Sequence, residues 1–369
     1  MVILKSVYVR HFRNLKEATF FFSPTANEII GNNGEGKTSL LEALYLCMSG
    51  GSFRTLRLRD AIDYGKKGFF VEACFEKGGI SSTLAISYDG QKRQVLLDSQ
   101  PCNSSSVLLG LIPGVIWTPD DAALITGSPA LRRRFLDIHI SQKDSHYVRH
   151  LYRFARALKQ RNALLREKTV ASITIWEQEL SISAAYITLQ RKQALEMLVP
   201  MARDYFLSFA TKKSDFAISY ETTLSRMFPD DLEKAYIQEF ARKRAQELEY
   251  GITLVGPHRD DFLVHCDKKS AKDFASVGQQ RLFALSLKLA EWHCLQQKVQ
   301  LPPIMLLDDF GAFLDAQRVG KLFSLCASLG QLFIAHHARI SPDTHRNCCL
   351  FHMQDGAAGI TVPDDGGEQ

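Results

Sequence analysis

The sequence predicts an α/β protein whose phosphate-binding nucleotide domain is split in the sequence by an inserted compact all-helical lobe. Two observations predict the nucleotide domain: a glycine-rich turn at 31–38 between an apolar run and a helical pattern, and an Asp-Asp pair at 308–309 after another apolar run. The block between them is poor in turn residues and has apolar residues at helical spacing. We therefore expect residues 1–118 and 245–369 to form the nucleotide domain and residues 119–244 the helical lobe.

Strand patterns occupy both ends of the chain. β-branched and apolar residues alternate, or run together, over short segments bounded by turn residues. Asp89-Gly90 is a hairpin turn signal between two such segments. We expect strands at 3–10, 18–22, 28–30, 69–75, 82–88, 95–98, 252–255, 304–307 and 332–335, and helices at 38–46 and 279–295.

Composition and length are those of an ordinary globular protein. The 369 residues are 46% hydrophobic and 23% charged, which excludes a mainly disordered or collagen-like chain. No apolar run reaches the roughly 18 residues that span a bilayer, and the first residues lack a signal-peptide pattern, so we expect a cytoplasmic protein. Eight cysteines without a Cys-x-x-Cys pair favour reduced thiols over a zinc site, also for the adjacent Cys348 and Cys349.

The turn at 31–38 fits the pattern G-x-x-x-x-G-K-[ST] at every required position. Glycines let the backbone fold around a polyphosphate with its N–H groups pointing inward, and the helix N-terminus adds partial positive charge. Lys37 is expected to reach the β- and γ-phosphates, and Thr38 to ligate Mg²⁺. A chance glycine-rich turn is the alternative. The residues expected to bind the nucleotide are Gly31, Asn32, Asn33, Gly34, Glu35, Gly36, Lys37, Thr38 and Ser39.

The Asp-Asp pair supplies the second acidic site that a phosphate-binding loop requires. Four apolar residues place the preceding strand, 304–307, in the core. Asp308 is expected to hold Mg²⁺, and Asp309 to orient or deprotonate the attacking water. A surface turn is the alternative. Lys37 and Asp308 are 271 residues apart, which a large insertion explains.

A third motif, Ser276-Val277-Gly278-Gln279, precedes the long helical pattern at 279–295. Alone it is no more than a helix cap. Ahead of the Asp-Asp strand it resembles the signature loop of ABC-type ATPases, in which serine, glycine and glutamine at a helix N-terminus bind the γ-phosphate of a nucleotide held by the other subunit. The resemblance implies that Ser276, Gly278 and Gln279 complete the site of a second copy. Asp315 matches a further aspartate of such proteins, near the subunit interface.

Several segments resemble the RecF family of bacterial DNA replication and repair proteins, which is related to the SMC proteins. The most diagnostic stretch is 119–137, and 9–14, 52–55, 160–162 and 256–261 also match. The resemblance implies a slow ATPase with ATP and Mg²⁺ as cofactors, an ATP-dependent homodimer, binding to gapped or junction DNA, and work with RecO and RecR in loading RecA. It also implies a link to the SOS response.

Two positions depart from the family pattern. Phe313 stands where relatives carry a polar residue, which leaves the interface motif around it open. His336 and His337 follow the last strand where relatives often have hydroxyl residues. Because other ABC-type ATPases carry a γ-phosphate-sensing histidine there, His336 is a candidate sensor. A structural histidine at a strand end is the alternative.

The net charge of +5 is unevenly distributed along the chain. Residues 131–168 contain eleven Lys and Arg against three acidic residues, a net +8, which leaves −3 for the rest. Arg149, Arg153 and Arg156 fall at helical spacing and are expected to neutralise DNA phosphates. An ordinary solvated helix face is the alternative. Arg132 and Arg133 are further candidates, with the alternative that arginines of this run fold back on the nucleotide domain.

Three other classes of protein share parts of this pattern. A nucleotide-binding subunit of a membrane transporter is disfavoured by the stretch at 119–137 and by the basic segment. A short SMC-like chromosome protein is disfavoured because the chain has no long coiled-coil pattern. A small-molecule P-loop kinase is disfavoured by the signature-like loop at 276–279.

Overall fold

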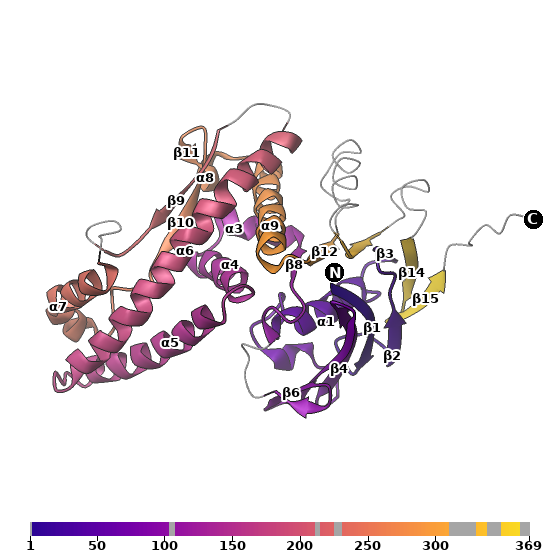
Figure 1. Cartoon of the computed structure of the whole chain (residues 1–369), viewed down its shortest axis with the longest axis horizontal. Coiled ribbons are helices and arrows are strands. Elements are labelled where there is room, and N and C mark those ends of the chain that lie inside the picture. Colours follow the sequence, from indigo (N-terminus) through magenta and orange to yellow (C-terminus); the bar gives the residue numbers. More distant parts are fainter. Residues whose placement is uncertain are drawn as a thin grey trace, which may run out of the picture. The chain divides into compact units, whose positions relative to one another are not determined.

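A computed structural model gives the fold and describes residues 2–102, 108–210, 215–224, 231–309, 330–337 and 348–361. The chain forms two compact units (Figure 1). The first consists of Met1–Asp121 and Glu291–Gln369, and the second of Ala122–Ala290. The split of the first unit by an insertion is thus observed, but residues 245–290, expected in the nucleotide domain, pack with the second unit.

An antiparallel sheet makes one half of the first unit. Its strand order is β2-β1-β4-β5-β6-β7, and Asp89 lies in the expected tight turn between β5 and β6. Alternate residues of β4 are buried, as expected for a sheet with one face on the core. The strands are β1 (Val2–Arg10), β2 (Ala18–Phe21), β4 (Phe69–Lys77), β5 (Ile80–Tyr88), β6 (Arg93–Leu97) and β7 (Gln100–Pro101).

A second, mostly parallel sheet combines two strands from the first 120 residues, β3 and β8, with four strands from the C-terminal part of the chain. Its order is β15-β14-β3-β13-β12-β8, in which β15 alone is antiparallel to its neighbour. Continuous apolar runs form its central strands because both faces are buried. The strands are β3 (Ala26–Ile30), β8 (Gly114–Trp117), β12 (Ile304–Asp308), β13 (Leu332–His336), β14 (Cys348–Gln354) and β15 (Ala357–Thr361).

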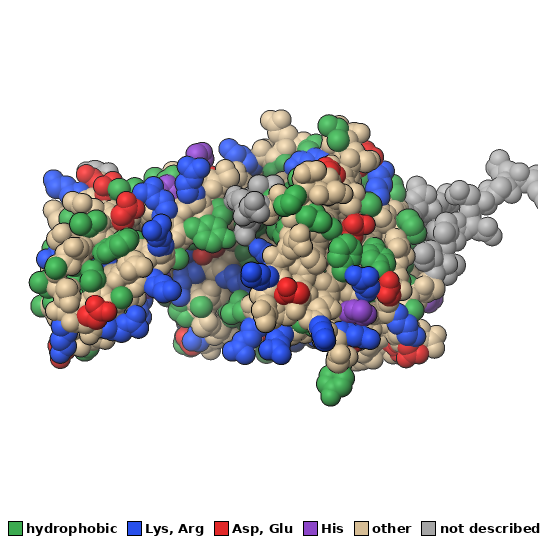
Figure 2. All heavy atoms as spheres, turned by 90° about the horizontal axis from the view of Figure 1, so that it is seen from below, with side chains coloured by type: hydrophobic (Ala, Val, Ile, Leu, Met, Phe, Trp, Pro, Cys, Tyr) green, Lys and Arg blue, Asp and Glu red, His purple; other side chains and the backbone are tan. Residues whose placement is uncertain are grey.

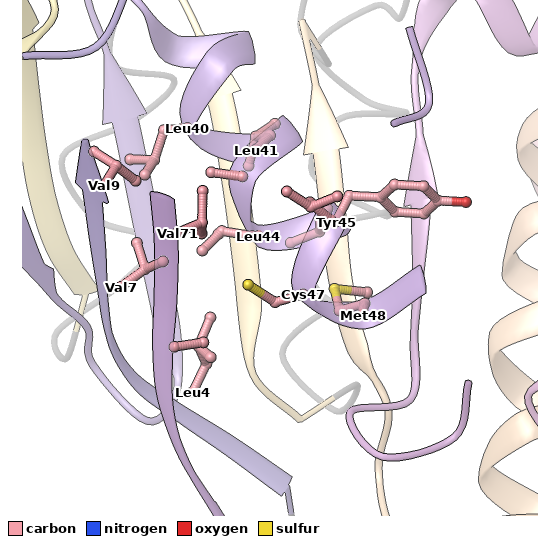
Figure 3. Close-up of a cluster of buried hydrophobic side chains, with 14 of the residues drawn as sticks. Leu4, Val7, Val9, Leu40, Leu41, Leu44, Tyr45, Cys47, Met48 and Val71 are labelled. Carbon is pink, nitrogen blue, oxygen red and sulfur yellow. The ribbon is translucent and has the colours of Figure 1, made fainter. Parts of the chain in front are cut away.

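Helix α1 (Lys37–Ser49) contacts strands of both sheets. Its side chains are buried nearly all round, so it has no polar face. Figure 3 shows Leu40, Leu41 and Leu44 against Val9 and Val71 of the antiparallel sheet. This packing fixes the N-terminus of α1 relative to β3 and β12. Two short 3₁₀ helices complete the unit, η1 (Leu58–Ala61) and η2 (Pro119–Ala122).

The second unit is helical but not all-helical, so that part of the prediction was wrong. A three-stranded antiparallel sheet, β9-β10-β11, packs against its helices. The sequence pattern did not predict this sheet, because β9 pairs with β10, which lies after residue 244, the expected end of the helical lobe. The elements are α3 (Ala123–Thr126), α4 (Pro129–Ser141), α5 (Ser145–Arg166), α6 (Ile173–Phe209), β9 (Phe216–Glu221), α7 (Leu232–Tyr250), β10 (Asp261–Cys266), β11 (Lys269–Ser270) and α8 (Ala271–Phe274).

Two further sequence predictions concern the chain around the second unit. The expected helix at 279–295 is confirmed as α9 (Val277–Val299), which contributes residues to both units. The expected strand at 252–255 was wrong. Two of its backbone N–H groups bond side chains instead of a neighbouring strand: Thr253 donates to Asn162 and Leu254 donates to Glu247.

Candidate nucleotide site

The glycine-rich loop leaves β3 and enters α1 through a backbone that only glycine tolerates. Gly36 has φ +103° and Gly31 has φ +156°. A Cβ atom on Gly31 would lie 2.6 Å from the carbonyl oxygen of Met353, and one on Gly36 would lie 2.9 Å from Leu15 Cδ2. The loop is therefore wedged against β14 and the β1–β2 connection, which holds it in shape.

The Lys37 side chain folds back onto the loop that precedes it. The side chain is 8% exposed, and its ammonium donates to the carbonyls of Gly31 at 2.6 Å and Asn32 at 2.7 Å. Burial lowers the pKa of Lys37, although the carboxylates of Asp308 and Asp309 act in the opposite direction. The ammonium is thus positioned at the mouth of the loop and held only by carbonyls, which a phosphate replaces readily.

The other loop residues have separate partners. Ser39 Oγ donates to Asn14 Oδ1 at 2.7 Å, and Asn14 Nδ2 donates to the carbonyl of Gly34 at 2.6 Å. Glu35 accepts the backbone N–H of Asp355. Ser39 and Glu35 therefore brace the loop from two sides.

Asp308 lies at the end of β12, directly beside the start of α1. Thr38 Oγ1 donates to Asp308 Oδ1 at 3.0 Å, so two residues 270 positions apart meet as expected. Burial, helped by the neighbouring Asp309, raises the pKa of Asp308 to about 6. A buried carboxylate with a raised pKa and a hydroxyl beside it suits a divalent cation, which replaces the lost hydration.

Most of these residues line one cavity of about 690 Å³ within the first unit, whereas Gly31, Asn32 and Glu35 do not. It brings together residues expected to bind the polyphosphate, the metal and the attacking water, namely Asn33, Gly34, Gly36, Lys37, Thr38, Ser39, Asp308 and Asp309. The glycine cradle, the buried ammonium and the Thr38–Asp308 pair fit a nucleoside triphosphate with Mg²⁺. Thr38 and Asp308 would hold the metal.

Arg13, Arg54 and Tyr64 are among the lining residues of this cavity to which the sequence assigned no role. Arg13 makes a two-pronged ion pair with the fully buried Glu42, at 2.9 and 2.7 Å, and Arg54 lies 3.4 Å from the same carboxylate. The only sequence signal was that Arg13 and Arg54 fall in two of the family-like segments. The sequence did not show that Glu42 binds both arginines, because these contacts join helix α1 to two separate loops.

The two adjacent histidines lie in different environments. His336 is 2% exposed on β13, and its Nε2 lies 2.7 Å from Glu28 Oε1. The next residue, His337, lines the cavity, and its Nε2 lies 3.6 Å from Asp309 Oδ1. The sequence could not choose between adjacent histidines because neighbouring strand residues point to opposite faces.

The signature-like loop lies in the second unit, at the start of α9. Gln279 Oε1 accepts the backbone N–H of Ser276 at 2.9 Å, and Ser276 Oγ accepts that of Gln279 at 3.3 Å. This is a capping box, which fixes the first turn of the helix. Ser276 and Gly278 are exposed and no atom crowds Gly278, so this helix end is open to solvent.

The five candidate DNA-binding arginines fall into two groups. Arg132 is 5% exposed, with a two-pronged ion pair to Asp261 at 2.7 and 2.8 Å, and Arg133 donates to the carbonyl of Asp260. The guanidinium of Arg132 thus holds α4 to the start of β10 and is committed to Asp261, whereas Arg133 is half-buried and held by a single carbonyl.

The other group is a stripe on α5, which we call the α5 stripe: Arg149, Arg153 and Arg156. All three are exposed, and Arg153 has one exposed partner, Glu179, at 3.0 Å. Figure 2 shows Lys and Arg side chains in several groups over the face drawn there, with fewer acidic side chains. An exposed pair of this kind contributes little to stability and leaves the arginine free to exchange partners.

Several expectations fall outside the described residues: the roles of Phe313 and Asp315, and the side chain of Cys348. Cys349 is a half-buried free thiol, and burial raises its pKa.

Within the described ranges, no helix is both long and apolar enough to cross a membrane.

Comparison with known proteins gives the family. The family model RecF/RecN/SMC N terminal domain matches residues 3–358. The chain is 43% identical to the DNA replication and repair protein RecF of Protochlamydia amoebophila, over 90% of this chain and 93% of that protein. The chain belongs to the RecF family. Another RecF, from Chlamydia trachomatis serovar A, is 34% identical over 97% of this chain and 98% of its own.

Solved structures agree with this assignment to the RecF family. A structure described as the recombination mediator protein RecF with ATP in the RecFOR pathway matches with a TM-score of 0.90 and 26% identity, over 98% of both chains. An Smc head domain of Pyrococcus furiosus matches with a TM-score of 0.57 and 16% identity, which shows a shared fold only. The ABC-type ATPase fold and the resemblance expected from the sequence are confirmed.

Proposed function

We propose that this RecF-family chain is an ATP-dependent DNA-binding protein of recombinational repair and replication. ATP closes two copies head-to-tail, the dimer recognises gapped or junction DNA, and it helps load RecA together with RecO and RecR. The observation that carries the proposal is the meeting of Lys37, Thr38 and Asp308 in one cavity. Likeness to a RecF bound to ATP in the RecFOR pathway supports it.

The cavity residues have separate tasks in this proposal. Lys37 and the loop N–H groups bind the β- and γ-phosphates, and Thr38 and Asp308 hold Mg²⁺, which offsets charge on the phosphates. Asp309 orients the attacking water or takes its proton. His337, rather than His336, is the residue placed to sense the γ-phosphate, because only His337 lines the cavity. Hydrolysis is slow and DNA-stimulated, and acts as a switch in the cytoplasm.

The signature-like loop acts on the other copy. An exposed, capped helix end with Ser276, Gly278 and Gln279 suits a phosphate held by a partner. Each copy would thus complete the nucleotide site of the other, so ATP is required for the pair to form. The α5 stripe then neutralises DNA phosphates without reading the bases.

Sedimentation with and without ATP and gapped DNA tests the dimer. We expect ATP-dependent dimers for the native chain and monomers for Lys37→Met, because the variant cannot hold the phosphates. Lys16→Met is the matched control, since Lys16 is an exposed lysine of the same unit that lines neither described cavity. Monomers of the native chain under every condition would contradict the proposal.

A further inference from the structure

A second cavity lies in the first unit, at one end of the antiparallel sheet. Its volume is about 900 Å³, and it shares no lining residue with the nucleotide cavity. The walls come from the end of β1, the start of β4 and the hairpin that joins β5 to β6. Neither the mechanism above nor the α5 stripe uses any of these residues, so the cavity needs an explanation of its own.

Basic side chains dominate the walls of this cavity. Arg10, Lys67, Lys92 and Arg93 line it, with His11 beside them. Arg93 donates to the carbonyl of Gly50, whereas Arg10, Lys67 and Lys92 are exposed. Three cations at one opening produce a positive potential that attracts an anionic ligand.

One acidic residue, Asp89, also lines the cavity. Its carboxylate accepts the backbone N–H groups of Gln91 at 2.8 Å and Lys92 at 2.7 Å, within the hairpin turn. The Asp89 carboxylate thus stabilises the turn that contains Lys92. With one acidic residue against four basic residues, the net charge of the cavity lining remains positive.

An aromatic ring lies beside these cations. Phe70 is a half-buried lining residue, and Arg10 lies opposite it in the sheet with its guanidinium 5.8 Å from the ring centroid. Tyr88, also in the lining, pairs with Phe69 and packs against the core on the other face of the sheet. A ring that is partly open to solvent beside basic side chains is the chemistry that binds a single nucleic-acid strand: a base stacks on the ring and the cations meet the phosphates.

We propose that this cavity binds single-stranded DNA, with Arg10, Lys67 and Lys92 on the backbone phosphates and an unpaired base against Phe70. The proposal rests on the DNA-binding function proposed above and adds to it. The α5 stripe contributes charge alone, and charge binds the phosphates of duplex and single-stranded DNA alike. An aromatic ring can stack only on a base that is not already stacked within a duplex.

The first test measures anisotropy of labelled oligo(dT), and of a duplex of equal length, on the full chain at several salt concentrations. For the double variant Lys67→Ser/Lys92→Ser we expect about tenfold weaker oligo(dT) binding and a salt slope smaller by about 1.4. Duplex binding should change by less than about twofold, because the α5 stripe is intact. The matched control, Lys16→Ser/Lys298→Ser, removes two exposed charges of the same unit that line neither described cavity.

The second test separates stacking from charge. Phe70→Leu keeps an apolar side chain and removes the ring, so oligo(dT) affinity should fall about fivefold with an unchanged salt slope. Urea unfolding checks that the Phe70→Leu variant still folds, since Phe70 is half-buried. If Lys67→Ser/Lys92→Ser behaves like its control, or loses duplex and single strand equally, the single-strand site is wrong. If the native chain binds neither DNA, the proposed function fails with it.

Discussion

At the scale of single residues, the buried, ionised carboxylate of Asp308 opposes folding. Its pKa is raised to about 6, so the folded chain holds this proton more tightly than the unfolded chain does. The unfavourable contribution is therefore absent below about pH 4 and complete above about pH 6. In the proposed site, Mg²⁺ bound with the nucleotide would offset this cost, because the cation would replace the missing hydration.

Asp308→Asn should raise the free energy of unfolding relative to the native chain. We expect a gain near zero at pH 4 that grows to about 3 kcal/mol at pH 7, since two pKa units correspond to about 2.7 kcal/mol. Urea unfolding at both pH values, without nucleotide, measures it. Asp120→Asn, an exposed acid in the same cavity, is the control and should show no such trend. An equal gain for Asp308→Asn at pH 4 and pH 7 would contradict this account.

Arg132 and Arg149 are both arginines of the basic segment, yet their environments differ. Arg132→Ala should cost about 3 kcal/mol of unfolding free energy, because it leaves the Asp261 carboxylate without its two-pronged partner. Arg149→Ala, on an exposed helix face, should cost less than about 0.5 kcal/mol. Denaturant melts compare the two directly. Similar costs for both variants would show that the buried pair does not hold α4 to β10.

At the scale of elements, α5 presents two faces with different tasks. Its buried face includes Phe154, Ala157 and Leu165, which pack in the second unit, and the α5 stripe lies on the exposed face. The exposed arginines of the α5 stripe are therefore separate from the apolar residues that pack the helix, so the stripe can be substituted while α5 stays in place.

Reversing the α5 stripe tests its role. Arg149→Glu/Arg153→Glu/Arg156→Glu should weaken DNA binding and reduce its salt slope by about 3 while ATP binding is unchanged, because the nucleotide cavity lies in the other unit. Binding of a labelled duplex and of a labelled ATP analogue measures both. The matched control reverses three exposed cations of the same unit, Arg203, Lys234 and Arg242. An unchanged salt slope for the stripe variant would remove α5 from the DNA interface.

At the scale of the whole molecule, the two units should respond differently to ATP. The lining of the nucleotide cavity comes from the first unit alone. ATP at one hundred times its Kd should therefore slow amide exchange there by the equivalent of about 2.7 kcal/mol.

Hydrogen exchange followed by mass spectrometry separates binding from dimer formation. In Ser276→Ala, which should bind ATP without closing a dimer, we expect protection only in the first unit. In the native chain, peptides around residues 276–279 should also be protected, because in the proposed dimer they contact the partner's nucleotide. Protection of 276–279 to the same extent in Ser276→Ala would contradict that assignment.

The sequence by itself determined the parts of this protein whose residues act locally. The strand, glycine-rich loop and helix at 26–49 form as expected, because each follows from periodicity and from backbone freedom at glycine. The apolar run before Asp308 likewise requires a buried strand with the carboxylate at its end. The capping box at the start of α9 is also a short-range pattern.

The two motifs predicted that Thr38 and Asp308 lie together, but only the tertiary structure decided the other distant contacts. It committed Arg132 to Asp261, placed His337 rather than His336 at the cavity, and paired β9 with β10 to give the inserted unit a sheet. Each depends on strand order or on the face to which a side chain points. A one-residue shift in register reverses that face, and no local pattern specifies contacts between residues hundreds of positions apart.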